Sequence, residues 1–100
     1  MHNFPPKLQS KIFLDAANQM MNWRDSNEID GEIMSQGTYT GHCCLRAISE
    51  VHKKDYTMHY HRAFFSYYFM PEKVGETQPW FKNDYESRIL ALLLASQIIE

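Results

Sequence analysis

The chain has 100 residues and a mass of 11.9 kDa, which is enough for one folded domain and leaves no room for a second core. Hydrophobic residues make up 44% and charged residues 22%, so the composition excludes a disordered chain and a fibrous repeat. The formal net charge of −2 does not favour a protein that binds nucleic acid through a strongly basic surface. We therefore expect a single globular domain over residues 1–100.

The first residues lack the basic start and the apolar run of a signal peptide. The longest apolar stretch, residues 89–95, is far shorter than the roughly 20 residues that span a bilayer. We therefore expect a cytoplasmic protein that does not bind membranes. The two cysteines, Cys43 and Cys44, are adjacent, and adjacent cysteines rarely pair with each other, so a disulfide scaffold is not expected.

The first predicted element follows Pro5 and Pro6, which suit the start of a helix. Apolar residues then recur at spacings of three and four, with Phe13, Ala17 and Met21 beside them. This stripe consists of Leu8, Ile12, Ala16, Met20 and Trp23. The spacing predicts an amphipathic helix over residues 6–23.

The periodicity stops over residues 25–41, where Gly31, Gly37 and Gly41 interrupt the chain. We predict an irregular segment here, with a short hairpin at Asp30 and Gly31. Its acidic residues, Asp25, Glu28, Asp30 and Glu32, have no basic residue among them to neutralise them. Such a run is typical of a solvated surface or of a patch that faces a partner.

Two further helices are predicted over residues 42–54 and 56–69. The first has Cys44, Leu45, Ile48 and Val51 at helical spacing, and it ends near two lysines that suit a helix C-terminus. In the second, two aromatic faces lie side by side, and Pro71 ends the helix. A strand is the alternative for this second segment, because Tyr, Phe and Thr favour sheets. One face contains Tyr60, Phe64, Tyr67 and Tyr68, and the neighbouring face contains His61, Phe65 and Phe69.

The last predicted helix covers residues 84–99 and follows a loop that contains Gly75 and Pro79. Its apolar residues cover more than one stripe, so it lies at the centre of the fold or packs against a second chain as well as its own. We expect Leu90, Leu93 and Leu94 to form the centre of the core. A homodimer contact through this helix is the alternative. Together the elements predict a mostly α-helical, compact domain of about four helices.

One group of residues suggests a small zinc or thiol-dependent domain. Cys43 and Cys44 lie within twenty-one residues of four histidines, and thiolate and imidazole are preferred zinc ligands. However, the spacing matches no standard zinc motif, and no nucleophile signature surrounds Cys43. We therefore predict no metal, no cofactor and no catalytic residue, and keep this site as an alternative. The histidines are His42, His52, His59 and His61.

A second alternative is a small nucleic-acid-binding protein. Basic residues exceed acidic ones between positions 42 and 62, and aromatic residues are interspersed with them, a mixture that can bind single strands. The excess is two charges, so direct contact with nucleic acid is not the favoured interpretation. The basic residues are Arg46, Lys53, Lys54 and Arg62.

Residues 41–100 resemble small uncharacterised bacterial and phage single-domain proteins. The resemblance is carried by Cys44-Leu45-x-Ala47-Ile48, Trp80-x-x-Asn83-Asp84 and Glu86-x-x-x-Leu90-x-Leu92-Leu93. It implies no activity and no functional residue. In size and in the lack of a catalytic signature, the chain also resembles phage-encoded inhibitors of host defence enzymes, such as inhibitors of the RecBCD nuclease or of CRISPR effectors.

We accordingly predict a non-catalytic protein-binding module, a phage or mobile-element accessory protein that binds and inhibits or modulates a host protein such as a nuclease complex. The predicted partner-binding residues are Trp80, Phe81, Glu28, Asp30 and Glu32. The alternative for Trp80 and Phe81 is a hydrophobic staple beneath the last helix. More large aromatic groups are present than a small core can hide, and interfaces are enriched in such groups. They are Trp23, Tyr56, Tyr60, Tyr67, Tyr68, Trp80, Phe81 and Tyr85.

Overall fold

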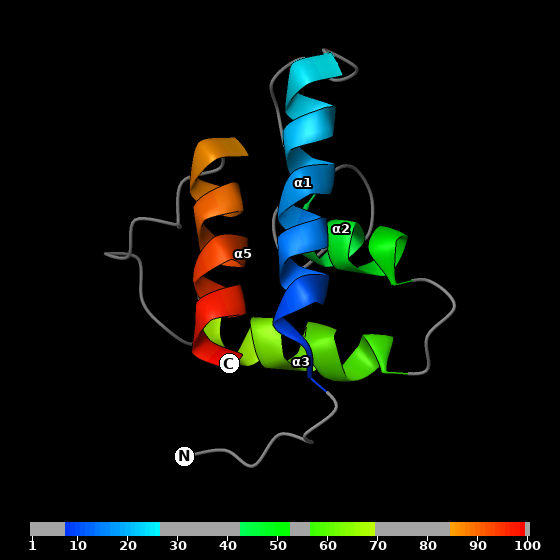
Figure 1. The fold of residues 1–100 in the computed structure, drawn as a ribbon, viewed down its shortest axis with the longest axis vertical. Coiled ribbons are helices and arrows are strands. Elements are labelled where there is room, and N and C mark those ends of the chain that lie inside the picture. Colours follow the sequence, from blue (N-terminus) through cyan, green and yellow to red (C-terminus); the bar gives the residue numbers. More distant parts are fainter. Residues whose placement is uncertain (1–7, 27–42, 53–56, 70–84, 100) are drawn as a thin grey trace.

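The computed structural model describes residues 8–26, 43–52, 57–69 and 85–99, and 91% of these residues are helical. The helices are α1 (Ser10–Ser26), α2 (Cys44–Val51), α3 (Met58–Phe69) and α5 (Tyr85–Ile99). Figure 1 shows their arrangement. The described part contains no strand, so the prediction of a mostly α-helical fold is confirmed, and the strand alternative for α3 is wrong. The predicted irregular segment over residues 25–41 lies outside the described residues, apart from Asp25 and Ser26 in α1.

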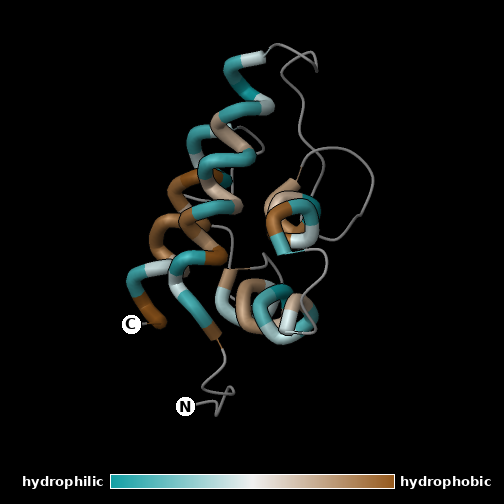
Figure 2. The backbone as a smooth tube through the Cα atoms, turned by 45° about the vertical axis from the view of Figure 1, so that its right-hand side comes forward, coloured by the Kyte–Doolittle hydropathy of each residue, from teal (hydrophilic) through white to brown (hydrophobic). Residues whose placement is uncertain are grey.

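The helices form two layers of two (Figures 1 and 2). In one layer α1 and α5 run antiparallel and pack side by side along their lengths. In the other layer α2 and α3 run across them, and the view of Figure 2 looks along both. None of the described helices is long and apolar enough to cross a bilayer.

Helix α1 buries the apolar stripe that its sequence predicts. Six of its residues are buried, and Leu8 and Met21 pack against the same core. The helix begins at Ser10, four residues later than predicted, and the carbonyl oxygen of Gln9 accepts a hydrogen bond from the Ile12 amide at 3.1 Å. At the other end the Ser26 hydroxyl donates to the carbonyl oxygen of Trp23 at 3.1 Å. The buried residues are Ile12, Phe13, Ala16, Ala17, Met20 and Trp23.

A cysteine caps the start of α2. Cys43 has extended backbone angles (φ −117°, ψ 173°), and its Sγ accepts a hydrogen bond from the Arg46 amide at 3.4 Å. A side chain that accepts from the third residue of a helix satisfies an amide that the helix leaves without a partner. Helix α2 spans eight residues, inside the predicted range of 42–54, and its apolar side faces α1.

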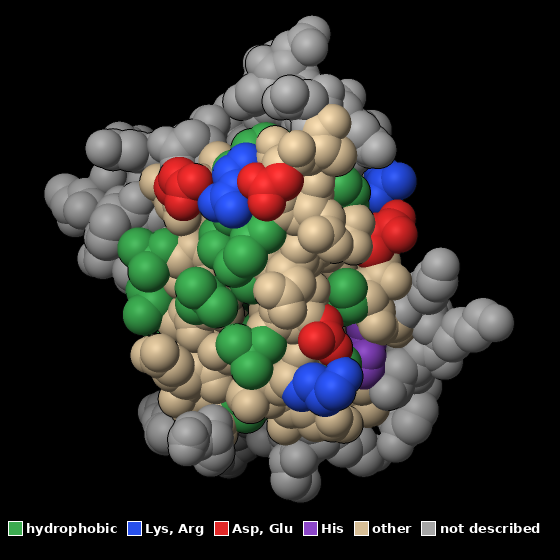
Figure 3. Space-filling model, turned by 45° about the horizontal axis from the view of Figure 1, so that its top comes forward, with side chains coloured by type: hydrophobic (Ala, Val, Ile, Leu, Met, Phe, Trp, Pro, Cys, Tyr) green, Lys and Arg blue, Asp and Glu red, His purple; other side chains and the backbone are tan. Residues whose placement is uncertain are grey.

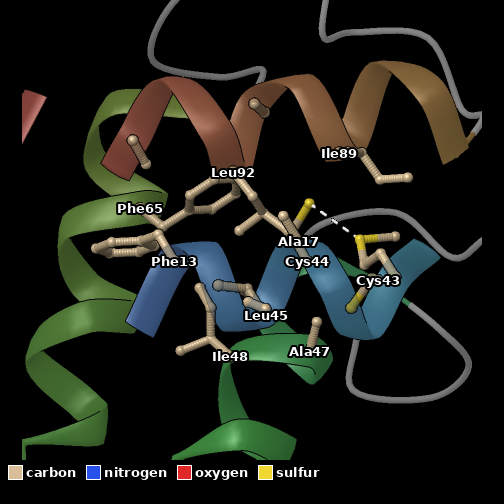
Figure 4. Close-up of a cluster of buried hydrophobic side chains, with 14 of the residues drawn as sticks. Phe13, Ala17, Cys43, Cys44, Leu45, Ala47, Ile48, Phe65, Ile89 and Leu92 are labelled. Carbon is tan, nitrogen blue, oxygen red and sulfur yellow. Dashed lines mark hydrogen bonds between the residues drawn. The ribbon is translucent and has the colours of Figure 1, made fainter. Parts of the chain in front are cut away.

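The core lies between the two layers (Figure 4). Its largest completely buried side chains are contributed by all four described helices, with Phe13 stacked on Phe65 at a ring distance of 6.4 Å. Cys44 packs here as a small apolar group, as its sequence context suggested. Its thiol contacts Met20 Sδ at 3.7 Å and the carbonyl oxygen of Arg88 at 3.4 Å. The completely buried side chains with the largest volumes are Phe13, Phe65, Met20, Ile48, Leu92 and His61.

The predicted core centre on α5 is wrong. Leu90 is 38% exposed, and Leu93 and Leu94 are half-buried at the edge of the core. The side of α5 that faces the other helices instead contains Ile89, Leu92 and Ala95. Since apolar residues surround this helix, hydrophobicity alone could not identify which side is turned inward.

Two of the large aromatic residues are buried, Trp23 as its place in the apolar stripe of α1 predicts, and Tyr85 on α5. Trp23 lies in the last turn of α1 and Tyr85 in the first turn of α5, and the antiparallel packing of these helices brings both into the core. Tyr67, by contrast, is 37% exposed, as expected of a surface aromatic group.

Candidate functional site

The partner-binding residues predicted from the sequence lie outside the described residues. These residues are Trp80, Phe81, Glu28, Asp30 and Glu32. Their role in binding stays a prediction, as does the alternative in which Trp80 and Phe81 form a staple beneath α5. The described part of the chain offers a different candidate surface, on the outer side of α5.

Three apolar residues follow one another at intervals of four along α5, from the edge of the core outward. Residues four apart lie on the same face of a helix, so Leu90, Leu94 and Ile98 form one stripe, here called the outer α5 stripe. Ile98 is 53% exposed and Leu90 is 38% exposed. In Figure 3, hydrophobic side chains gather over α5 on the left of the molecule. The stripe is therefore an apolar surface that is exposed at Leu90 and Ile98 and half-buried at Leu94, which packs against the edge of the core.

One end of the outer α5 stripe is charged. Glu86 continues the same four-residue spacing, and its carboxylate accepts a hydrogen bond from Arg24 Nη1 at 2.8 Å. Arg24 Nε also donates to Asp25 at 2.9 Å, so one guanidinium lies between two carboxylates. Hydrogen bonding to Asp25, followed by the charge of Asp25 and the contacts with Glu86, raises the pKa of Arg24 despite an opposing desolvation effect. The cluster carries a net charge of −1, and its carboxylates are more exposed than the guanidinium.

The outer side of α1 has a different character. Lys11 and Asp15 form an exposed ion pair at 2.7 Å, and Asn18 and Asn22 are exposed. Leu14 is 42% exposed there, but it has polar neighbours along its helix. The continuous apolar surface thus belongs to α5, while α1 presents a single exposed leucine.

The two cysteines lie inside the fold. Both side chains are buried, and neither forms a disulfide. Burial raises the pKa of the Cys43 thiol, and hydrogen bonds from backbone amides, chiefly that of Arg46, offset this only in part. A nucleophilic cysteine typically has a lowered thiol pKa and access to substrate, which differs from the buried position of Cys43. In the structure Cys43 caps the start of α2.

The histidines of the suggested zinc site have other partners. His61 is completely buried between the backbone amide of Gln9 and the carbonyl oxygen of Thr57. His52 contacts the Thr57 hydroxyl at 2.7 Å, and the ring of His59 lies beside Tyr60. Among the residues that the structure describes, no three His, Cys, Asp or Glu side chains are placed to hold a metal ion. His42 lies outside that part of the chain.

The basic residues of the suggested nucleic-acid surface are only partly described. Arg46 forms an ion pair with Glu50 at 3.3 Å, one turn further along α2. Desolvation lowers the pKa of Arg62, which is half-buried on α3. Lys53 and Lys54 lie outside the described residues. The two described arginines do not form a cluster of free positive charge.

Sequence reasoning identified the apolar excess of α5 but expected Leu90 and Leu94 to lie in the core. The four-residue spacing joins Glu86 to Leu90, Leu94 and Ile98, but charge gave no sign of the outer side, because Arg88, the other charged residue of α5, is buried. The Arg24–Glu86 pair had no local signal either, since 62 residues separate its members. No family model, curated protein or solved structure matches this chain.

Proposed function

We propose that this protein is a non-catalytic protein-binding module and that the outer α5 stripe is part of its contact surface. The observation that carries the proposal is the apolar row in which Leu90 and Ile98 are exposed and Leu94 between them is half-buried. Exposed apolar residues that adjoin one another and are bordered by charged groups are typical of protein-binding sites. A single exposed leucine, such as Leu14 on α1, needs no such explanation.

The charged end of the stripe indicates the chemistry of the partner. Asp25 and Glu86 outnumber Arg24, so this end favours a partner that has basic groups beside an apolar patch. Glu28, Asp30 and Glu32 follow α1 closely in the sequence and add three more negative charges. Charges at the rim of an interface chiefly increase the rate of encounter and exclude wrong partners. The partner we infer is thus a protein with an apolar patch and a basic rim.

A host enzyme that acts on nucleic acid offers the basic part of such a surface, because the groups that contact phosphates are basic. We propose that the protein binds and inhibits or modulates an enzyme of this class, for example a nuclease complex. This assignment rests on the acidic rim and on the resemblance to phage-encoded inhibitors. Such an inhibitor needs a complementary surface and no catalytic group.

The proposal is tested by placing a photo-crosslinking amino acid at position 98 of the full-length protein, and at position 14 in a matched control. Ile98 and Leu14 are both large, apolar and exposed, but they lie on different helices. We expect a host protein to be crosslinked from position 98 and not from position 14. Mass spectrometry of the crosslinked peptide then identifies the partner and the surface that it uses.

Sedimentation of the purified protein over a wide concentration range is the companion measurement. A concentration-dependent dimer that is lost in Ile98→Ser would show that a second copy covers the stripe, and it would contradict the proposed host partner. An equal yield of crosslinked host protein from positions 14 and 98 would contradict the choice of the α5 surface. A monomer that crosslinks to one host protein from position 98 supports the proposal.

A further inference from the structure

A buried histidine joins the chain before α1 to the start of α3. The imidazole of His61 is completely buried, and its Nε2 accepts a hydrogen bond from the backbone amide of Gln9 at 2.9 Å. Its Nδ1 lies 3.0 Å from the carbonyl oxygen of Thr57. The ring also contacts Phe13 of α1 at a centroid distance of 5.4 Å. One side chain on α3 thereby holds the N-terminal end of α1.

These two hydrogen bonds determine where the proton of His61 lies. A backbone amide can only donate, so Nε2 must provide its lone pair to Gln9. A backbone carbonyl oxygen can only accept, so Nδ1 must carry the hydrogen that binds Thr57. The ring is therefore the neutral Nδ1–H tautomer, and both nitrogens are in use. A second proton can bind at Nε2 only if the Gln9 amide moves away.

A second buried histidine lies against the first. The ring of His52, at the end of α2, meets the ring of His61 edge-on at a centroid distance of 4.7 Å. His52 Nε2 is 2.7 Å from the Thr57 hydroxyl, so the two histidines contact the same residue through different atoms. The two rings therefore lie in contact inside the fold and share Thr57 as a partner.

Charged groups are also present on the helices that carry or contact the two histidines. On α1 the ammonium of Lys11 binds Asp15 at 2.7 Å, and on α2 Arg46 binds Glu50 at 3.3 Å. On α3 itself, His59 is exposed and its ring lies beside Tyr60. The other charged group on α3 is Arg62, and Lys53, Lys54 and Asp55 lie outside the described residues.

We propose that His61, supported by His52, is an acid-sensitive latch that holds Gln9 and the start of α1 to α3 and opens as the pH falls. In an unfolded or locally opened chain an imidazole takes up a proton near pH 6.5. In the closed state Nε2 is occupied, so the open state binds more protons. Stability that the latch contributes is therefore complete above about pH 6.5 and declines as the pH falls through that value.

The test is nuclear magnetic resonance of the full-length, unmodified protein between about pH 7.5 and about pH 5, which brackets the ordinary titration of imidazole. At the upper limit we expect the ¹⁵N signals of His61 to show a protonated Nδ1 and an unprotonated Nε2. On acidification we expect Nε2 to become protonated together with a loss of hydrogen-exchange protection at the Gln9 amide. The protection factor should fall about tenfold, the change that corresponds to one pH unit of proton linkage.

His61→Gln is the matched variant, since glutamine has an acceptor and a donor but does not titrate in this range. We expect the pH dependence of Gln9 protection to disappear in His61→Gln and to persist in His59→Gln, which changes an exposed histidine on the same helix. The wild-type spectra decide the proposal even if His61→Gln does not fold. A His61 that protonates while Gln9 stays protected, or a Gln9 that loses protection while His61 stays neutral, would overturn it.

Discussion

Leu92 and Leu90 lie two residues apart on α5 and face opposite environments: Leu92 is completely buried, whereas Leu90 is 38% exposed. Leu92 lies on the side that faces the other three described helices, and Leu90 begins the outer α5 stripe. This difference determines which leucines hold the fold together and which are free to bind a partner.

We expect Leu92→Ala to lower the free energy of unfolding by about 2–5 kcal/mol, because it leaves a cavity in a closely packed core. Leu90→Ala should cost about 1 kcal/mol or less, since part of that side chain already lies in water. Urea denaturation of both variants measures the difference. Equal losses in the two variants would contradict the orientation of α5.

Thr57→Val should destabilise the protein by about 1–3 kcal/mol, because it removes the hydroxyl that His52 contacts inside the core. Thr57→Ser keeps a hydroxyl and serves as the control, and it should lose less stability than Thr57→Val. Urea denaturation near neutral pH provides the comparison. If the two variants lose the same stability, the missing methyl group or the changed backbone preference matters more than the hydrogen bond.

Cys43 and Cys44 should react slowly with iodoacetamide in the folded protein at neutral pH. Both thiols are buried, and burial raises the pKa of Cys43, so little thiolate is present at neutral pH. Above the ordinary thiol pKa the unfolded chain loses the Cys43 proton first, so high pH should destabilise the fold and speed the reaction. Mass spectrometry follows the labelling, with protein unfolded in urea as the reference. Labelling of Cys43 at the unfolded rate would contradict its burial and restore the thiol-dependent alternative.

Trp80→Ala tests the contact predicted from the sequence outside the described residues. If Trp80 binds the partner, the variant should weaken capture and leave thermal unfolding unchanged, because interface tryptophans commonly contribute about 2 kcal/mol or more to binding. If Trp80 is instead a staple beneath α5, the variant should lower the melting temperature. Circular dichroism during heating separates these two outcomes.

The elements whose apolar residues form one stripe were predictable from the sequence. In α1 the residues from Ile12 to Trp23 recur at helical spacing, and that side is the one the structure buries. In α5 the same reasoning found the helix and placed Leu90 in the core, because a helix that is apolar all round gives no sign of its orientation until a neighbour is known.

The polar contacts were beyond such reasoning for a different reason. The Gln9 amide and His61 are 52 residues apart, so no local pattern could join them. Cys43 as a helix cap was missed because cysteine is not among the usual N-cap residues, and its Sγ acts here in place of a hydroxyl or carboxylate oxygen. The contact between Gln9 and His61 forms only when the two layers of helices pack together.

The central claim is that the outer α5 stripe binds a protein partner. Isothermal titration calorimetry with the purified host protein that crosslinking identifies tests it most directly. Leu90→Ser and Ile98→Ser are compared with Leu14→Ser, after each is shown to unfold at the same temperature as the wild type. We predict that each stripe variant raises the Kd about tenfold or more, which corresponds to about 1.4 kcal/mol, while Leu14→Ser leaves it nearly unchanged. An unchanged Kd for both stripe variants, or an equal rise for Leu14→Ser, would contradict the claim.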